Sequence, residues 1–103
     1  MLFLFSCEEK KIIALNTESI QKEALSLRNK GIENYNAQNF NTAFYDFNKS
    51  KKLFEVLKDS ANIGYILIQI SMIQQVNGDY YGSKETVTEA LSYVKKRAST
   101  VLI

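Results

Sequence analysis

The chain has 103 residues, of which 46% are hydrophobic and 23% charged, with 13 Lys and Arg, 11 Asp and Glu, no His, no Pro and one Cys. This composition is typical of one small globular domain or a short repeat array, and it excludes a disordered chain. It offers no histidine as a general base or metal ligand, no second cysteine for an internal disulfide and, at a net charge of +2, no basic stripe of the kind expected for nucleic-acid binding.

The first 17 residues form a segment unlike the rest of the chain. Met1 to Phe5 is an apolar run, followed by Ser6, Cys7 and a polar stretch that begins at Glu8. An apolar stretch that ends at a small residue and a cysteine is typical of a processing segment. The other interpretation is a frayed N-terminus with an inert apolar cysteine.

The string Leu4-Phe5-Ser6-Cys7 resembles the processing box of bacterial lipoproteins, and Glu8-Glu9 resembles the surface-export signal of Bacteroidetes lipoproteins. The resemblance implies that Cys7 becomes the lipidated first residue and that residues 8–17 form a polar tether in the cell envelope. The apolar run is shorter than the roughly 7–15 residues of a signal peptide, and no basic residue precedes it. The resemblance therefore also implies a start codon upstream. Without lipidation, we expect the chain in the cytoplasm.

Apolar residues recur at helical spacing in four later segments. In residues 63–73 the β-branched side chains would also suit a buried strand, but a helix packed between two neighbours is apolar on several sides. Gly78 can adopt the left-handed conformation after a helix, and Asp59 and Asp79 can cap the helices that follow them. The spacing predicts helices near residues 18–37, 41–58, 60–77 and 81–98.

The second pair of predicted helices repeats the first after a shift of 40 positions. Large residues align with large ones and small residues with small ones, which is the signature of helical-repeat proteins. The aligned pairs are Leu27 and Leu67, Gly31 and Ser71, Phe40 and Tyr80, Ala43 and Ser83, Phe47 and Val87, and Ser50 and Ala90. We expect helices to approach closely at the small residues and Phe47 to fill the core between them.

This pattern resembles the tetratricopeptide (TPR) repeat over residues 18–98. Leu27 and Gly31 match the first-helix signature, Ala43-x-x-x-Phe47 matches the second helix, and Gly78-Asp79-Tyr80 matches the turn. The period of 40 instead of 34, and the absence of the helix-ending proline, resemble a longer variety of the family. The resemblance implies an all-α fold of four antiparallel helices, the start of an α-solenoid.

The implied organisation has two TPR-like repeats between short ends. Residues 1–17 precede the first repeat at 18–58, and residues 59–98 form the second repeat. Residues 99–103 are an apolar end that ends in Val101-Leu102-Ile103. Because soluble arrays need a polar capping element, we expect a fragment, a truncated gene product or a homodimer that buries this end.

The resemblance also implies a groove, lined by the first helix of each repeat, that binds a protein or peptide. In some members of this family a carboxylate clamp binds the C-terminal carboxylate of chaperones. The clamp has a basic residue at the position of Arg28 and an asparagine at the positions of Ile32 and Met72. Because this chain lacks both asparagines, the resemblance does not imply a chaperone partner. The alternative interpretation is that Ile68 and Met72 are core residues with no role in binding. The implied groove residues are Arg28, Ile32, Tyr35, Asn36, Tyr65, Ile68, Met72 and Gln75.

The sequence predicts a protein without catalytic activity and without a cofactor. Cys7 has no histidine to activate it, and the four glycines do not form a phosphate-binding loop. The first functional hypothesis is an envelope lipoprotein whose repeats scaffold a complex. The alternative is the sensory N-terminal part of a bacterial signalling or transcription regulator whose effector domain is missing. A nonfunctional gene remnant is a third interpretation.

Overall fold

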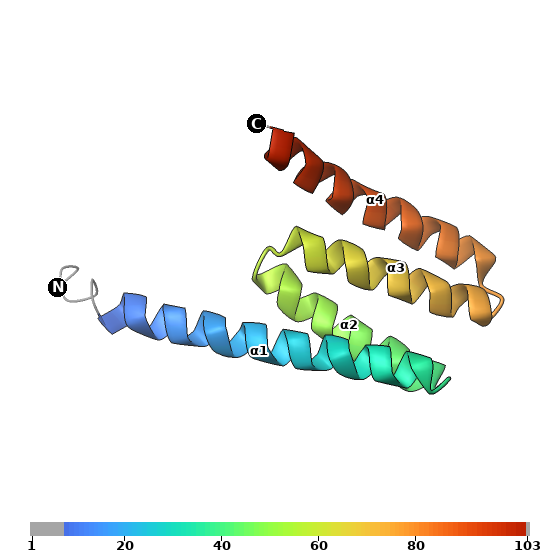
Figure 1. The fold of residues 1–103 in the computed structure, drawn as a ribbon, viewed down its shortest axis with the longest axis horizontal. Coiled ribbons are helices and arrows are strands. Elements are labelled where there is room, and N and C mark those ends of the chain that lie inside the picture. Colours follow the sequence, from blue (N-terminus) through green and yellow to red (C-terminus); the bar gives the residue numbers. More distant parts are fainter. Residues whose placement is uncertain (1–7, 103) are drawn as a thin grey trace.

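The computed structural model describes the backbone of residues 8–102 and the side chains of residues 16–95. Over this range the chain forms two helical hairpins and contains no strand, which confirms the all-α prediction. Consecutive helices pack against each other, so that α2 and α3 lie between α1 and α4 (Figure 1). The four helices are α1 (Glu8–Asn36), α2 (Phe40–Val56), α3 (Ser60–Val76) and α4 (Tyr80–Leu102).

The two outer helices are longer than the sequence pattern predicts. The predicted boundary at residue 18 is wrong, because α1 begins at Glu8 and its helical backbone runs through the expected tether. The predicted end at residue 98 is also wrong, because α4 continues to Leu102. Neither extension contains Gly or Pro, and the first is rich in good helix formers such as Glu, Lys, Ala and Leu. The first extension has no regular apolar spacing, so periodicity does not find the start of α1.

All three connections end a helix in the same way. The second residue of each connection has a left-handed backbone, with φ of 65° at Gln38, 55° at Lys58 and 80° at Gly78. The next backbone N–H then donates to a carbonyl five residues earlier, as from Asp59 to Phe54 at 3.0 Å. These are Schellman turns, which satisfy carbonyl groups that the helix end leaves free.

Two aspartates begin the helices of the second hairpin, as predicted. The Oδ1 atom of Asp59 accepts from the backbone N–H of Asn62 at 3.1 Å. The same atom of Asp79 accepts from the N–H of Gly82 at 2.9 Å. Each carboxylate thus satisfies one free donor at a helix start.

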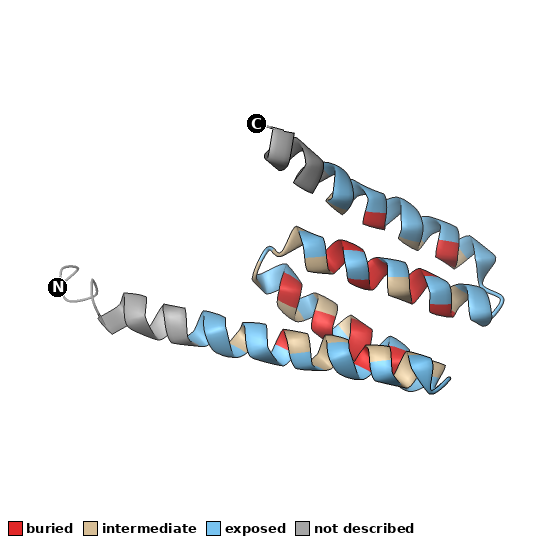
Figure 2. Cartoon of the chain, viewed as in Figure 1, coloured by how far each residue is buried: buried red, intermediate tan, exposed pale blue. Residues whose placement is uncertain are grey.

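The core lies along the middle of the molecule, mainly on α2 and α3 (Figure 2). Phe47 is fully buried, and a Cβ added at Gly31 would lie 2.7 Å from its ring, so the large and small residues fit as predicted. α3 is buried on two sides and has no charged residue, which explains why residues 63–73 also resemble a strand. The buried hydrophobic residues are Ala24, Ala43, Phe47, Phe54, Ile63, Ile66, Leu67, Ile70, Ile73 and Ala90.

Candidate functional site

A row of large side chains on α3 points away from the core. Tyr65, Ile68 and Met72 are spaced by three and four residues, which places them on one side of the helix. Their exposed fractions are 40%, 42% and 39%, whereas their neighbours Ile66 and Ile70 are buried. Ile68 and Met72 are therefore not interior core residues, although they were alternatively predicted as such. Exposed apolar side chains in a contiguous row are a feature of interaction surfaces.

Arg28 of α1 extends this row across to the neighbouring helix. Its guanidinium lies over the ring of Tyr65, with Cζ 5.6 Å from the ring centroid, and it donates a hydrogen bond to Oδ1 of Asn62. The Nδ2 of Asn62 in turn donates to Oδ2 of Asp59 at 2.8 Å. The cation is thus held in place by a stacked ring and a hydrogen-bonded amide from α3.

The predicted groove residues of the first repeat are less accessible than those of the second. Ile32 and Tyr35 are half-buried and pack against the core, where the ring of Tyr35 meets that of Phe40 edge to face at 5.4 Å. Asn36 and, on α3, Gln75 are exposed. Of the eight predicted residues, the geometry brings together a central group, which we call the α1–α3 face. It consists of Arg28, Tyr65, Ile68 and Met72.

The partners of Arg28 are residues that the sequence did not suggest as part of the site. Asn62 lies 34 positions away and matches no apolar or small-residue pattern. Its neighbour Asp59 is recognisable only as a helix cap. A pair of polar side chains on different helices has no periodic pattern, so only the tertiary structure shows this contact between α1 and α3.

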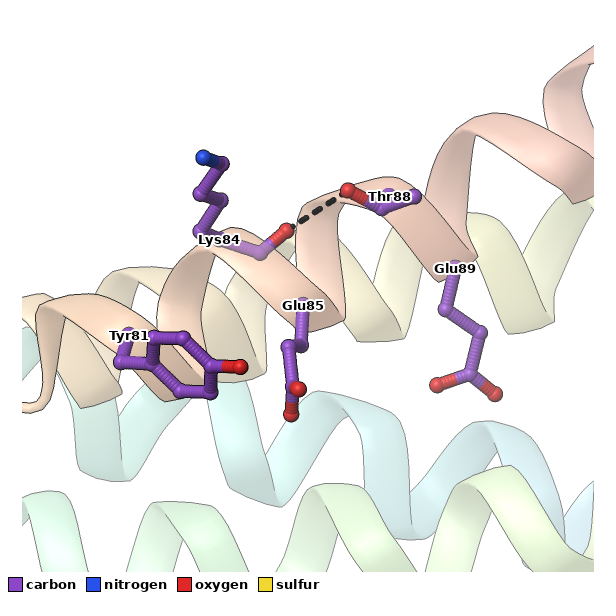
Figure 3. Close-up of a pocket in the computed structure, with 5 residues that line it drawn as sticks. All are labelled: Tyr81, Lys84, Glu85, Thr88 and Glu89. Atoms are coloured by element: carbon purple, nitrogen blue, oxygen red, sulfur yellow. Dashed lines mark hydrogen bonds between the residues drawn. The ribbon is translucent and has the colours of Figure 1, made fainter.

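The surface hollows among the described residues are each lined by side chains from one helix or from two neighbouring helices and the turn beside them. The hollow in Figure 3 runs along α4 alone, and its side chains are all exposed. A hydrogen bond within that helix joins Thr88 to the carbonyl of Lys84 at 2.9 Å. A second hollow lies between the ends of α2 and α3, beside Phe44 and Gln74. Among the described residues, no group of three His, Cys, Asp or Glu residues could hold a metal ion.

The predicted lipidation site, Cys7, lies outside the described residues. The helical backbone begins at the next position, Glu8. Within the described part of the chain, none of the four helices combines the length and the hydropathy needed to cross a bilayer.

No protein-family model, no curated protein and no solved structure matches this chain.

Proposed function

We propose that this chain is a TPR-like repeat module without catalytic activity, which binds a segment of another protein on the α1–α3 face. The observation that carries the proposal is the row of Tyr65, Ile68 and Met72, about two-fifths exposed on a helix that has no charged residue. Tyr, Met and Arg are types enriched at protein interfaces. The resemblance to TPR repeats supports the same face, because their first helices line the binding groove.

The chemistry of the face indicates the kind of segment that it would bind. Three large apolar side chains offer contact area, and the guanidinium of Arg28 offers a single positive charge. Its orientation is already set by Tyr65 and Asn62, so little side-chain entropy is lost on binding. A complementary segment would carry apolar side chains and an acceptor, such as a carboxylate, opposite Arg28.

Photocrosslinking in cells tests this proposal. A photoreactive amino acid would be placed at Ile68 or Met72, and at Lys30 or Glu33 in matched controls. The controls are exposed, and the helical spacing places them on the side of α1 opposite to Arg28. We expect a discrete crosslinked product from the α3 positions only, lost when Tyr65→Asp is added. Equal products from all four positions would contradict the proposal.

We further propose that Cys7 anchors the module to the cell envelope, on the strength of Leu4-Phe5-Ser6-Cys7. Because α1 begins at Glu8, a helix and not a loose tether would then join the lipid to the repeats. The test is labelling with palmitate from the gene with its native upstream DNA. Label that disappears in Cys7→Ala supports the anchor, and absence of label in both proteins contradicts it.

A further inference from the structure

The turn between α3 and α4 contains Asn77-Gly78, and no other asparagine in the sequence is followed by glycine. Both residues are exposed, at one end of the second hairpin (Figure 2). A Cβ placed at Gly78 would have no contact within 4 Å apart from its neighbours in the chain. In residues 16–95, whose side chains the structure describes, no hydrogen bond holds the side-chain amide of Asn77. This amide is therefore free to react with the backbone that follows it.

An asparagine followed by glycine can close a ring with the backbone, because glycine has no side chain that shields its nitrogen. The backbone nitrogen of Gly78 gives its proton to solvent base and attacks Cγ of Asn77. The new C–N bond closes a succinimide ring, while Nδ2 takes up a proton and leaves as ammonia. Water then opens the ring at either carbonyl carbon, which gives aspartate or isoaspartate. The net reaction, deamidation, consumes water, releases ammonia and changes no oxidation state.

The Schellman turn restrains the nitrogen that would attack. The N–H of Gly78 donates to the carbonyl of Gln75 at 3.0 Å, and the N–H of Asp79 donates to that of Gln74 at 2.8 Å. Asp79 also caps α4 through the N–H of Gly82. While the turn is closed, the nitrogen keeps its proton in a hydrogen bond. The reaction therefore requires local opening of the turn, which is a minor state of the folded chain.

The other two connections have the same kind of turn but not this pair. Their left-handed residues are Gln38 and Lys58, which follow Ala37 and Leu57. We infer that Asn77 is a site of spontaneous deamidation, and that opening of the turn between α3 and α4 limits its rate. This turn is separate from the α1–α3 face, so its chemistry does not depend on the function proposed above.

Deamidation weakens the turn in which it occurs. It places a new carboxylate at the end of α3, where the helix dipole disfavours negative charge, two residues before the carboxylate of Asp79. Isoaspartate also adds the side-chain Cβ to the backbone, and the longer backbone cannot keep both hydrogen bonds of the Schellman turn. Protein in which Asn77 has reacted should therefore unfold at a lower urea concentration than fresh protein.

Mass spectrometry of the full chain, aged in mildly alkaline buffer, measures the reaction. Trypsin releases the peptide of residues 59–84, which contains Asn77 and also Asn62. Because Asn62 is followed by isoleucine, it serves as an internal reference. A synthetic peptide of residues 72–84 gives the rate without the fold. We expect deamidation at Asn77 in both samples, at least about tenfold more slowly in the full chain, and much slower reaction at Asn62.

Two variants separate the chemistry from the opening of the turn. Asn77→Gln should stop the reaction, because glutamine would have to close a larger ring. Asp79→Ala removes the cap of α4 and should raise the rate in the full chain about twofold or more. The same change in the synthetic peptide, which has no helix to cap, should have a smaller effect.

Four results would overturn the inference. The first is a rate at Asn77 in the full chain that is no higher than the rate at Asn62. The second is an equal rate at Asn77 in the full chain and in the peptide, because the turn would then not restrain the nitrogen. The third is an effect of Asp79→Ala that is no larger in the full chain than in the peptide. The fourth is an unchanged urea midpoint in fully deamidated protein.

Discussion

The two hairpins are related by a shift of 40 residues, but the side chains at aligned positions differ in size and in burial. In the first, the ring of Phe47 lies where a Cβ at Gly31 would come within 2.7 Å. In the second, Val87 stands at the position of Phe47 and Ser71 at the position of Gly31. Val87 is smaller than Phe47 and is 37% exposed, whereas Ser71 is buried and larger than glycine. The first hairpin therefore has a close-packed contact at these positions, and the second has a smaller side chain that is partly open to solvent.

A hydroxyl group also changes place between the hairpins. In the first, Ser50 is buried and its Oγ donates to the carbonyl of Ala24 at 2.7 Å, while Ala43 has no polar atom in its side chain. In the second, Ala90 takes the place of Ser50, and Ser83 takes the place of Ala43. The Oγ of Ser83 is buried without a hydrogen-bond partner. The buried hydroxyl of the first hairpin therefore has a hydrogen-bond partner, and that of the second does not. We expect the first hydroxyl to stabilise the fold and the second to destabilise it.

The largest expected effect is at Phe47. Phe47→Ala should lower the free energy of unfolding by about 3–5 kcal/mol, because it leaves a cavity in the fully buried core. Val87→Ala at the aligned position should cost much less, because Val87 is smaller and 37% exposed. Urea unfolding followed by circular dichroism would measure both changes. Equal losses would show that the two hairpins contribute equally to the core.

The contact between Gly31 and Phe47 can be tested by measuring the energetic coupling between substitutions at the two positions. Gly31→Ala should cost about 1–2 kcal/mol, since overpacking against the buried ring outweighs the helix propensity gained by alanine. In a Phe47→Val background, which resembles the second hairpin, the same change should be neutral or stabilising. A double-mutant cycle in urea would then give a coupling energy of about 1 kcal/mol or more. Additive effects would mean that the close approach does not constrain this position.

Removing the two buried hydroxyl groups should change the stability in opposite directions. Ser50→Ala should destabilise by about 1 kcal/mol, because it removes a buried hydrogen bond. Ser83→Ala should stabilise by about 1 kcal/mol, because it removes a buried hydroxyl that has no partner. Thermal unfolding of the two variants, side by side, measures the contrast. A loss of stability in Ser83→Ala would show that this hydroxyl is satisfied in solution.

The smallest expected effect is in the turns. Gln38 aligns with Gly78, and both have a left-handed backbone, which is unfavourable for residues other than glycine. Gln38→Gly should therefore stabilise by up to about 1 kcal/mol, and Gly78→Ala should destabilise by a similar amount. Chemical denaturation would measure the pair. The same sign for both changes would contradict the equivalence of the two turns.

Much of the fold could be predicted from the residues alone, because helices leave periodic patterns. The spacing around Phe47, the small residues such as Gly31 and the turn at Gly78 predicted two hairpins and the contacts inside them. The ends of α1 and α4 could not be found in this way. Residues 8–17 follow no clear apolar period, and their helix depends on local propensity and on continuation from the packed part of α1.

The candidate site was only partly predictable. Tyr65, Ile68 and Met72 share a side of α3 by spacing, but spacing does not say whether that side faces a neighbouring helix or solvent. The spacing of Ile32 and Tyr35 in the sequence also did not show that both side chains are half-buried. The link from Arg28 to Asn62 joins residues that are distant in sequence, and no periodicity connects them.

The sequence by itself therefore determined the helical class, the repeat of 40 residues and the matched large and small pairs, because these depend on side-chain spacing and size. Only the tertiary structure decided which apolar sides are covered. The order in which the helices stack buries Phe54 and leaves Val94 51% exposed at the aligned position. Burial is a property of neighbours, and a residue's neighbours across a helix interface are set by the packing of the whole chain.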